Sequence, residues 1–489
     1  MAKNDVQFPH VLIFPLPLQG PVNCMLKLAE LLAINEFHVT FLNTEYIQDR
    51  LLKHTHVQSR FDHYPGFNFE TVPDGLPEDH PRTGDKFIEI ANGMEEVVKP
   101  LFEEMLTNGK LSLKSSKPVT FVIADGFYSF ANDIAKGAGI PLVYFDTISP
   151  CSLWTFFCLP RLIESGEVPF KEDEYDRKVK GVPGSENCLR YRDLPSFFGT
   201  SDLNERIIQL ILQEVKEIPR SEGLILNTSE HIEGPILSQL STICPNNYPI
   251  GPLHALHESI LLSAQKASPQ VNSSNSLWED DISCMTWLDG QPPKSVIYVS
   301  IGSLAVMTSD QLMELCHGIV NSGKRFLWSQ RPGSLGGQYD NYTIPEELSD
   351  AMKERGCILS WVYQVEVLAH PAIGLFLTHS GWNSTLESFV EGVPMICWPY
   401  FADQQVNSRF VQEVWRVGID LKDKCDRVTI EKAVREVMED KKDEFEKSAS
   451  RMAKLARQSV VDRGGSSHYN FNRLVEDIRV MSLRISAHD

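Results

Sequence analysis

Residues 361–404 read WVYQVEVLAHPAIGLFLTHSGWNSTLESFVEGVPMICWPYFADQ. Two short apolar runs lie within this stretch, AIGLFLTH (372–379) and VPMICWP (393–399). Continuous apolar runs of this length are typical of strands that are buried on both faces of a parallel sheet. A Gly turn follows the first run and leads into a helix that we expect to start near Asn383. The stretch therefore predicts one β-α-β unit of a doubly wound α/β domain.

The same pattern recurs on both sides of this stretch. Strands are expected at 10–14, 38–43, 118–125, 140–147, 223–229, 295–303, 324–330, 356–362, 372–379 and 393–399. The segment 67–85 is rich in proline and is expected to be irregular, and 223–229 is expected to be the last strand of the first half. Ser309 and Thr429 are expected to cap the helices that follow them.

The chain of 489 residues is long enough for two to three domains. We predict a first domain over 1–253 and a second over 284–465. Between them, 254–283 is polar and rich in Ser and Asn, which indicates a linker. The final segment, 466–489, is expected to form a helix that packs back on the first domain.

Charge and composition exclude several function classes. The formal net charge of −19 disfavours nucleic acid and anionic membranes as partners, because both require a basic surface. The ten cysteines are scattered, without a CxxC pair or metal-ligand spacing, which favours a reducing compartment over a disulfide framework. No signal peptide and no apolar run of about 18 residues are present, so we expect a soluble cytoplasmic protein without a membrane span.

The turn between the two apolar runs carries the chemistry of an anion site. The free N–H groups at a helix N-terminus attract anions, and His379, Asn383 and Ser384 add hydrogen-bond donors around it. Glu387 lies one helical turn beyond Ser384 and can face the same site. A carboxylate repels phosphate but suits two vicinal hydroxyls, as in a ribose.

The flanks of the stretch supply the remaining parts of a nucleotide-sugar site. Trp361 offers a flat face for a base, and Asp403 and Gln404 offer hydrogen bonds to sugar hydroxyls. Asp125 and Thr147 end strands of the first half and point to the same crevice, because ligands of open α/β sheets bind at the carboxyl ends of strands. Each residue alone is compatible with a purely structural role, whereas their order along the chain matches base, ribose, diphosphate and sugar.

The stretch resembles the signature box of plant family 1 UDP-glycosyltransferases and has its full length. Shared motifs extend over nearly the whole chain: FPLPLQG (14–20), VPDGLP (72–77), ADGF (124–127), RDLPSF (192–197), ILNTSE (225–230), YPIGPL (248–253), CMTWLDGQPPKSVIYVSIGS (284–303) and FLW (326–328). The resemblance implies two facing Rossmann-like domains of the GT-B type. It also implies transfer of glucose from UDP-glucose, with inversion to a β-glucoside, to a hydroxyl or carboxyl of a small, partly apolar plant metabolite. Within the family, the chain is most similar to the branch that acts on terpenoids, iridoids and related small alcohols.

The resemblance also implies which residues hold the donor. Uracil would stack on Trp361 and contact the backbone of Val362, and the ribose hydroxyls would bind Glu387. The diphosphate would be held by His379, Asn383, Ser384 and Ser303, and the sugar by Trp382, Asp403 and Gln404. The full donor-binding set is Thr147, Ser303, Trp361, Val362, Gln364, His379, Trp382, Asn383, Ser384, Glu387, Asp403 and Gln404. No metal and no cofactor besides the donor are expected, and the protein is expected to be a monomer.

One departure from the family concerns the catalytic base. The family has a His immediately after the Gly of the first loop, and this chain has Pro21 there. The partner of that His in the family matches Asp125. Three interpretations remain open: Asp125 acts on the acceptor directly or through a water, the acceptor is acidic enough to need little help, or the chain binds UDP-sugar with weak or no turnover. A positioned base is worth roughly 10²–10⁴ in rate.

The acceptor site is less well defined by the sequence. Residues 150–220 are rich in aromatic side chains, which fit either core packing or the wall of an apolar acceptor pocket. Two other function classes are alternatives: a nucleotide-sugar binding protein without turnover, and another enzyme with two Rossmann-like domains such as an epimerase or phosphorylase. Formation of a glycoside from UDP-glucose and an acceptor distinguishes a transferase from both.

Overall fold

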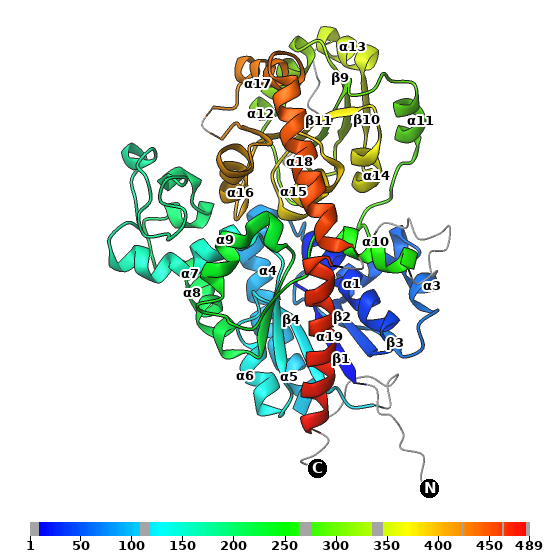
Figure 1. Cartoon of the computed structure of the whole chain (residues 1–489), viewed down its shortest axis with the longest axis vertical. Helices are drawn as coiled ribbons and strands as arrows, with labels where there is room; N and C mark the ends of the chain where they lie inside the picture. The colour runs from blue at the N-terminus through cyan, green and yellow to red at the C-terminus, as the bar shows by residue number, and fades with distance from the viewer. Residues whose placement is uncertain are drawn as a thin grey trace.

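A computed structural model of the chain describes residues 9–107, 117–263, 275–334, 346–422, 424–461 and 464–485. The described chain forms two lobes, each built on a parallel sheet flanked by helices (Figure 1). This arrangement confirms the predicted α/β class with two Rossmann-like domains.

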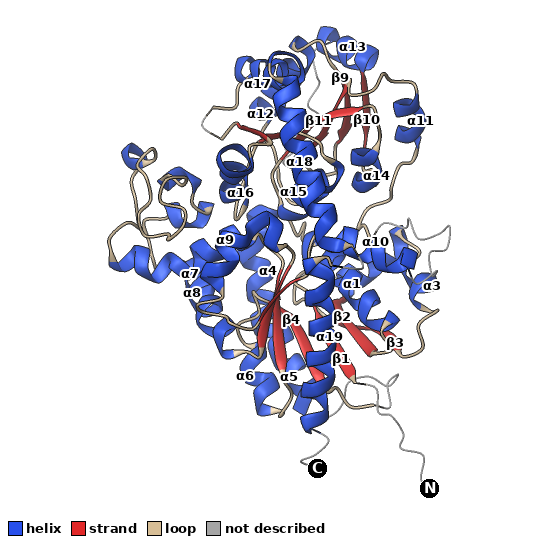
Figure 2. Ribbon diagram, in the orientation of Figure 1, coloured by secondary structure: helices blue, strands red, loops and turns tan. Residues whose placement is uncertain are grey.

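The first sheet contains seven described strands. They are β1 (His10–Phe14), β2 (His38–Thr44), β3 (Phe67–Val72), β4 (Phe121–Asp125), β5 (Leu142–Asp146), β6 (Gly223–Leu226) and β7 (Asn247–Pro249). Their order is β3-β2-β1-β4-β5-β6-β7, and every neighbouring pair is parallel (Figure 2).

The second sheet contains six described strands with the same topology. They are β8 (Val296–Ser300), β9 (Arg325–Ser329), β10 (Gly356–Leu359), β11 (Ile373–Thr378), β12 (Met395–Cys397) and β13 (Gly418–Asp420). Their order is β10-β9-β8-β11-β12-β13, again parallel throughout. In each sheet the winding reverses beside the first strand, between β1 and β4 and between β8 and β11. Ligands of open α/β sheets bind outside the carboxyl ends of the strands at this point.

Helices connect the strands of both sheets. Those of the first lobe are α1 (Gln19–Ile34), α2 (Glu45–His54), α3 (Val57–Phe61), α4 (Phe87–Gly93), α5 (Lys99–Thr107), α6 (Ala131–Gly137), α7 (Pro150–Glu164), α8 (Arg206–Glu217), α9 (Glu230–Leu240) and α10 (Leu253–Ser263). Those that follow are α11 (Ser283–Asp289), α12 (Ser309–Asn321), α13 (Glu346–Arg355), α14 (Gln364–Ala369), α15 (Trp382–Glu391), α16 (Gln404–Phe410), α17 (Arg427–Arg435), α18 (Lys442–Val460) and α19 (Ser466–Ile485).

The strands that the sequence did not predict all lie at sheet edges. The expectation that 67–85 is irregular was wrong for its first part, because 67–72 forms β3. The expectation that 223–229 is the last strand of the first half was also wrong, because β7 follows it, and β13 was not predicted. Central strands such as β4 are buried along their whole length and give a continuous apolar run, whereas β3 is mostly half-buried and alternates Phe-Asn-Phe-Glu. β7 and β13 have only three residues each.

Two helix caps lie earlier in the chain than predicted. α12 is capped by Thr308, not by Ser309, and Thr308 and Gln311 form a reciprocal capping box. α17 is capped by Asp426, not by Thr429, because the carboxylate of Asp426 accepts a hydrogen bond from the Thr429 backbone N–H at 2.8 Å. In each case the first turn of the helix contains the residue that was expected to precede it.

The predicted linker is helical at its start. Residues 254–263 belong to α10, which packs on α1, and residues 264–274 lie outside the described residues. The part after 275 is held against the first lobe, since the Gln19 side chain accepts a hydrogen bond from the Leu277 backbone N–H at 2.7 Å. The domain boundaries themselves stay predictions.

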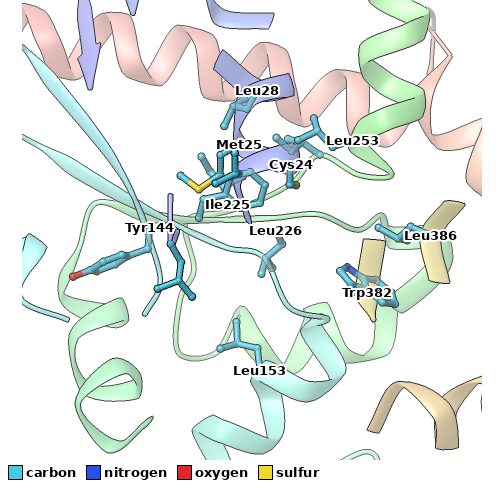
Figure 3. Packing of buried hydrophobic residues seen from close by; sticks show 14 of the residues in the cluster. Cys24, Met25, Leu28, Tyr144, Leu153, Ile225, Leu226, Leu253, Trp382 and Leu386 are labelled. Atoms are coloured by element: carbon cyan, nitrogen blue, oxygen red, sulfur yellow. The ribbon is translucent and has the colours of Figure 1, made fainter. Parts of the chain in front are cut away.

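The two lobes share buried contacts. Trp382 and Leu386 of α15 belong to the same apolar cluster as Leu226 of β6 and Leu153 of α7, although they come from opposite lobes (Figure 3). The C-terminal helix α19 packs on β7 and β4, and the Tyr248 hydroxyl donates to Asp477 at 2.8 Å. In Figure 1, α18 descends from the second lobe and α19 continues across the first. The prediction that the last helix returns to the first domain is therefore confirmed.

Candidate active site

A single cavity of the described chain joins the carboxyl ends of both sheets. It is bordered by the loops after β1, β4 and β5 of the first lobe and after β8 and β11 of the second. All of the predicted site residues line it: Asp125, Thr147, Ser303, Trp361, Val362, Gln364, His379, Trp382, Asn383, Ser384, Glu387, Asp403 and Gln404. Pro21 lines it as well. The structure thus brings the predicted set together, and the role of each residue stays a prediction.

The N-terminus of α15 opens into this cavity. Ser380 turns the chain after β11 with a φ of +65°, and Gly381 precedes the helix without a side chain to cap it. The first N–H groups of α15 therefore have no side-chain cap, and the helix dipole adds positive charge at the same place. This end of the cavity is suited to an anion such as a diphosphate.

Two glycines enclose the ring of His379. A Cβ atom on Gly302 or on Gly381 would overlap with the imidazole Nε2, and Gly302 also has a φ of +77°. Burial lowers the pKa of His379 to about 4. The ring is therefore neutral near pH 7 and offers one N–H donor next to the end of α15.

The carboxylate of Glu387 is held by an amide. The Gln364 side chain donates to Glu387 Oε2 at 2.6 Å and to Ser384 Oγ at 2.8 Å, and it accepts from the Tyr298 hydroxyl at 3.2 Å. Burial raises the pKa of Glu387, while the Gln364 amide and the charge of Lys27 oppose that shift. One carboxylate with a fixed orientation is thereby presented to the cavity.

Trp361 is supported from behind by a second indole. Its ring stacks on Trp278 with 4.7 Å between centroids and 29° between planes. The guanidinium of Arg50 lies 5.0 Å from the centroid of the Trp278 ring. Because Trp361 itself lines the cavity, the stack presents a rigid aromatic surface where the base is predicted to bind.

Asp403 and Gln404 occupy the tight turn that leads into α16. Gln404 Oε1 accepts hydrogen bonds from the backbone N–H groups of Tyr400 at 2.9 Å and Phe401 at 3.2 Å. Asp403 Oδ2 accepts from the Asn407 amide at 2.8 Å, and burial raises the pKa of Asp403 to about 6. Both side chains are therefore fixed by hydrogen bonds to their own loop and to α16, at the place where the sugar is predicted to bind.

The first residues of α15 also join the two lobes. The indole N–H of Trp382 donates to the Asn227 carbonyl at 2.8 Å. The Asn383 amide donates to the Gly20 carbonyl at 3.0 Å and accepts from the Asn227 amide at 3.2 Å. Asn383 therefore contributes to the contact between lobes in this structure, and its side chain would have to turn in order to donate to a phosphate.

The opposite wall of the cavity is acidic. Asp125 Oδ1 accepts from the Phe127 backbone N–H at 3.1 Å, and its Oδ2 accepts from the Thr147 hydroxyl at 3.4 Å. Burial, followed by the charge of Asp146, raises the pKa of Asp125 to about 7. Pro21 lies in the first turn of α1, where a missing backbone N–H breaks no helical hydrogen bond. The fold thus accepts proline at this position, but proline provides no proton acceptor.

Comparison with curated proteins identifies the family. The chain is 53% identical over 472 residues to a 7-deoxyloganetic acid glucosyltransferase of Catharanthus roseus, with 96% of this chain and 97% of the relative covered. This protein belongs to the UDP-glycosyltransferase family. A 7-deoxyloganetin glucosyltransferase of Gardenia jasminoides is 37% identical, with 96% and 97% covered. Residues 268–461 match the family model described as UDP-glucoronosyl and UDP-glucosyl transferase.

A solved structure extends the likeness to the fold. Os79 from O. sativa in complex with UDP superposes with a TM-score of 0.77 at 27% identity, with 96% of this chain and 100% of Os79 covered. The glycosyltransferase has the GT-B fold, as predicted. It is an inverting, UDP-dependent glycosyltransferase, and the alternative of a UDP-sugar-binding relative without turnover is not supported.

Several functional groups of the glycosyltransferase were not predicted from the sequence. Trp278 supports Trp361, and Asn407 links Asp403 to the Ser380 carbonyl at 2.9 Å. Lys27 of α1 lines the cavity and donates to Asn23, and its pKa is lowered to about 8 by burial, while Glu387 opposes the shift. These residues lie outside the signature box. Of the three, only Lys27, a charged residue on the apolar helix after the first strand, could have been noticed in the sequence as unusual.

The aromatic segment of the glycosyltransferase, 150–220, contributes side chains both to the core and to the lining of the cavity. Phe156 and Phe197 line the cavity. Trp154 and Phe198 are buried in the core, and the Trp154 indole donates to the Pro183 carbonyl at 2.9 Å. Phe156 is also buried in the core, so core packing and the cavity lining overlap in this segment, and the acceptor wall stays a prediction.

Two further findings concern metals and membranes. Within the described ranges, no group of three or more His, Cys, Asp or Glu side chains is arranged to hold a metal ion. The helices among these residues are all too short or too polar to cross a bilayer. All ten cysteines of the chain are free thiols.

Proposed function

We propose that the acceptor is an iridoid or a closely related small terpenoid, and that the group that receives glucose is a hydroxyl. The observation that carries this proposal is the 53% identity, over 96% of the chain, to a protein named 7-deoxyloganetic acid glucosyltransferase. The relatives named for 7-deoxyloganetin, at 39% and 37% identity, support the same chemical class.

The acceptor end of the cavity suits a compact apolar ring system. Its wall is formed mainly by aliphatic and aromatic side chains from the first lobe, namely Leu16, Leu18, Phe87, Phe127, Ile148, Phe156 and Phe197. A few polar groups, including Asp125, lie within this apolar surface. Small-molecule sites commonly combine an apolar wall with a few orienting polar groups.

The charge around Asp125 favours a hydroxyl over a carboxylate as the attacking group. Asp125, Asp146 and Glu214 line this end of the cavity, and Lys27 is the only Lys or Arg among the described lining residues. A carboxylate placed against Asp125 would meet like charge in a buried site, which is costly. A hemiacetal hydroxyl of the kind found in iridoids is neutral and more acidic than a simple alcohol, so a carboxylate base is sufficient for it.

The reaction then proceeds as a direct displacement. The acceptor hydroxyl transfers its proton to the Asp125 carboxylate while its oxygen forms a bond to the anomeric carbon of glucose. The bond between that carbon and the UDP oxygen breaks on the opposite face, which inverts the α-linked donor to a β-glucoside. The electron pair leaves on the diphosphate, where the N-terminus of α15 and the neutral imidazole of His379 supply hydrogen-bond donors.

The proposal includes neither a metal nor a further cofactor. The donors at α15 offset the charge of departing UDP, and the site is completed by residues of one chain, so we also propose that a monomer is active. The ten free thiols support a cytoplasmic location. Unchanged turnover after treatment with EDTA tests the first point, and the active mass in solution tests the second.

A panel of matched acceptors tests the acceptor class. An iridoid hemiacetal acid should be glucosylated, its O-methyl acetal should not react, and a carboxylic acid of the same size without the hemiacetal should not react. Product mass and release of UDP measure the reaction, and resistance of the product to mild alkali distinguishes a glucoside from a glucose ester. An alkali-labile ester, or turnover of phenols alone, would contradict the proposal.

A further inference from the structure

Two additional acidic side chains lie directly beside Asp125. Asp146 ends β5, the strand next to β4, and Glu214 reaches toward it from α8. Each is only 3% exposed. A Cβ atom on Gly126 would lie 2.9 Å from Asp146 Oδ2 and 3.3 Å from Glu214 Oε1, so the two carboxyls meet over the residue that follows Asp125.

Among the described residues, no Lys or Arg side chain pairs with either of these two carboxyls. Asp146 Oδ1 accepts from the Ile148 backbone N–H at 3.1 Å. Asp146 Oδ2 and Glu214 Oε2 are buried and have no other hydrogen-bond donor among the residues that the structure describes. Two carboxylates in contact cannot both stay ionised in a buried site, but one proton shared between them satisfies both groups. Burial raises the pKa of Asp146 to about 6, and burial together with the charge of Asp146 raises the pKa of Glu214 well above its usual value.

We propose that Asp146 and Glu214 are positioning residues for the base: they share one proton, and the remaining negative charge keeps Asp125 basic enough to take the acceptor's proton. This inference rests on the proposed role of Asp125. It explains how a carboxylate, normally a weak base, can act in a family member that has Pro21 in place of the usual His.

Among the groups around Asp125, the pair of Asp146 and Glu214 is the principal source of negative charge. Cys24 of α1 and Tyr128 of the same loop face Asp125, but burial raises the pKa of Cys24 to about 12 and raises that of Tyr128, so both are neutral. Asp403 faces Asp146 from the second lobe. The charge of Asp146 adds to burial in raising the pKa of Asp125 to about 7, close to the pH at which a general base works best.

The pair does not itself exchange protons with the substrate in this scheme. The acceptor proton moves to Asp125, the acceptor oxygen bonds to the anomeric carbon, and UDP leaves with the electron pair of the broken bond. The shared proton stays on Glu214 throughout. After the product departs, Asp125 returns its proton to solvent.

The pH dependence of kcat/KM for the acceptor, at saturating UDP-glucose, tests the inference. Asp146→Asn removes the negative charge, so the acidic limb should move to lower pH by roughly one unit, and the plateau should fall roughly tenfold because Asp125 becomes a weaker base. Glu214→Gln is the matched variant: its amide still donates to Asp146 and leaves the charge in place. Its acidic limb should therefore stay at the wild-type position.

Affinity for UDP, measured by calorimetry, should be unchanged in both variants. An unchanged affinity would show that the variants are folded. If Asp146→Asn does not fold, Asp146→Ser removes the same charge and should give the same shift. An acidic limb that stays in place in a folded Asp146 variant, or moves equally in Glu214→Gln, overturns the inference. Full activity of Asp125→Asn would instead overturn the role of Asp125 itself, so the two failures are distinguishable.

Discussion

The two walls of the cavity differ in how their buried polar side chains are paired. On the second lobe, the polar side chains are paired: Gln364 holds Glu387, and Asn407 holds Asp403. On the first lobe, Asp125, Asp146 and Glu214 are buried together, and none of them forms an ion pair with a Lys or Arg among the described residues. The wall of the second lobe, called the donor wall because UDP-glucose is predicted to bind there, is therefore preorganised. The wall of the first lobe, called the base wall because of the proposed role of Asp125, holds unneutralised acid next to an apolar pocket.

The difference separates recognition of the donor from removal of the proton. A preorganised hydrogen-bonding surface binds the same UDP-sugar whatever the acceptor. The same donor-binding residues can therefore occur in family members that act on different acceptors. The base wall must match the acidity of one hydroxyl, and there the chain has Pro21 and a group of carboxyls instead of a His. Variants on the two walls should therefore affect different kinetic constants.

The largest effect is expected for Asp125→Asn. The amide cannot accept the proton, so turnover of an alcohol or hemiacetal acceptor should fall roughly 10²–10⁴-fold. The affinity for UDP should stay the same, because the change lies on the base wall. Initial rates of glucoside formation and calorimetric titration with UDP measure the two quantities.

Acceptor acidity supplies the control for this variant. A phenol that is already ionised at the assay pH needs no base, so it should lose far less activity in Asp125→Asn than a hemiacetal does. Equal losses for both acceptors would show that Asp125 supports the structure of the pocket and does not take the proton.

On the donor wall, Glu387→Ala should raise the KM for UDP-glucose. Hydrogen bonds to a charged group are worth roughly 1.5–3 kcal/mol, which corresponds to an increase of about 10- to 150-fold. Glu391→Ala is the matched control, since Glu391 lies one turn later on α15 and pairs with Arg457 at 3.0 Å outside the cavity. A similar KM in both variants would argue against ribose binding by Glu387.

A smaller effect on the same wall is expected for Trp278→Ala. Loss of the stacked ring leaves Trp361 in place but less rigid, and aromatic pairs are worth roughly 0.5–1.5 kcal/mol, so UDP should bind about 2- to 13-fold more weakly. Calorimetry with UDP alone measures this change. Trp361→Ala is the reference, and an effect of Trp278→Ala larger than that of Trp361→Ala would show that Trp278 touches the base directly.

The same contrast explains what the sequence could predict. The central strands and the signature box were identified because buried parallel strands are continuous apolar runs and because ten of the twelve predicted donor residues lie within the 44 residues 361–404. All of the predicted site residues do line one cavity. Edge strands such as β3 were missed, since half-buried or very short strands give weak patterns.

The base wall was harder to predict because it is assembled from distant segments. Asp146 and Glu214 are 68 positions apart and meet over Gly126 only in the folded chain. Trp278 supports Trp361 from the far side of the lobe junction. Contacts of this kind depend on tertiary packing, and no local sequence pattern predicts them.

The smallest effect, and the most direct test of the contrast, is expected for Pro21→His. The new imidazole would lie in the first turn of α1, on the same cavity as Asp125, and could take the acceptor proton. Because Asp125 already acts as a base in our proposal, the gain in turnover should be less than tenfold. Loss of proline should cost roughly 0.4–1 kcal/mol in the free energy of unfolding, and Pro21→Ala measures that cost without adding a base. A gain above a hundredfold over Pro21→Ala would mean that the native wall lacks a working base, and the acidic group beside Asp125 would then need another explanation.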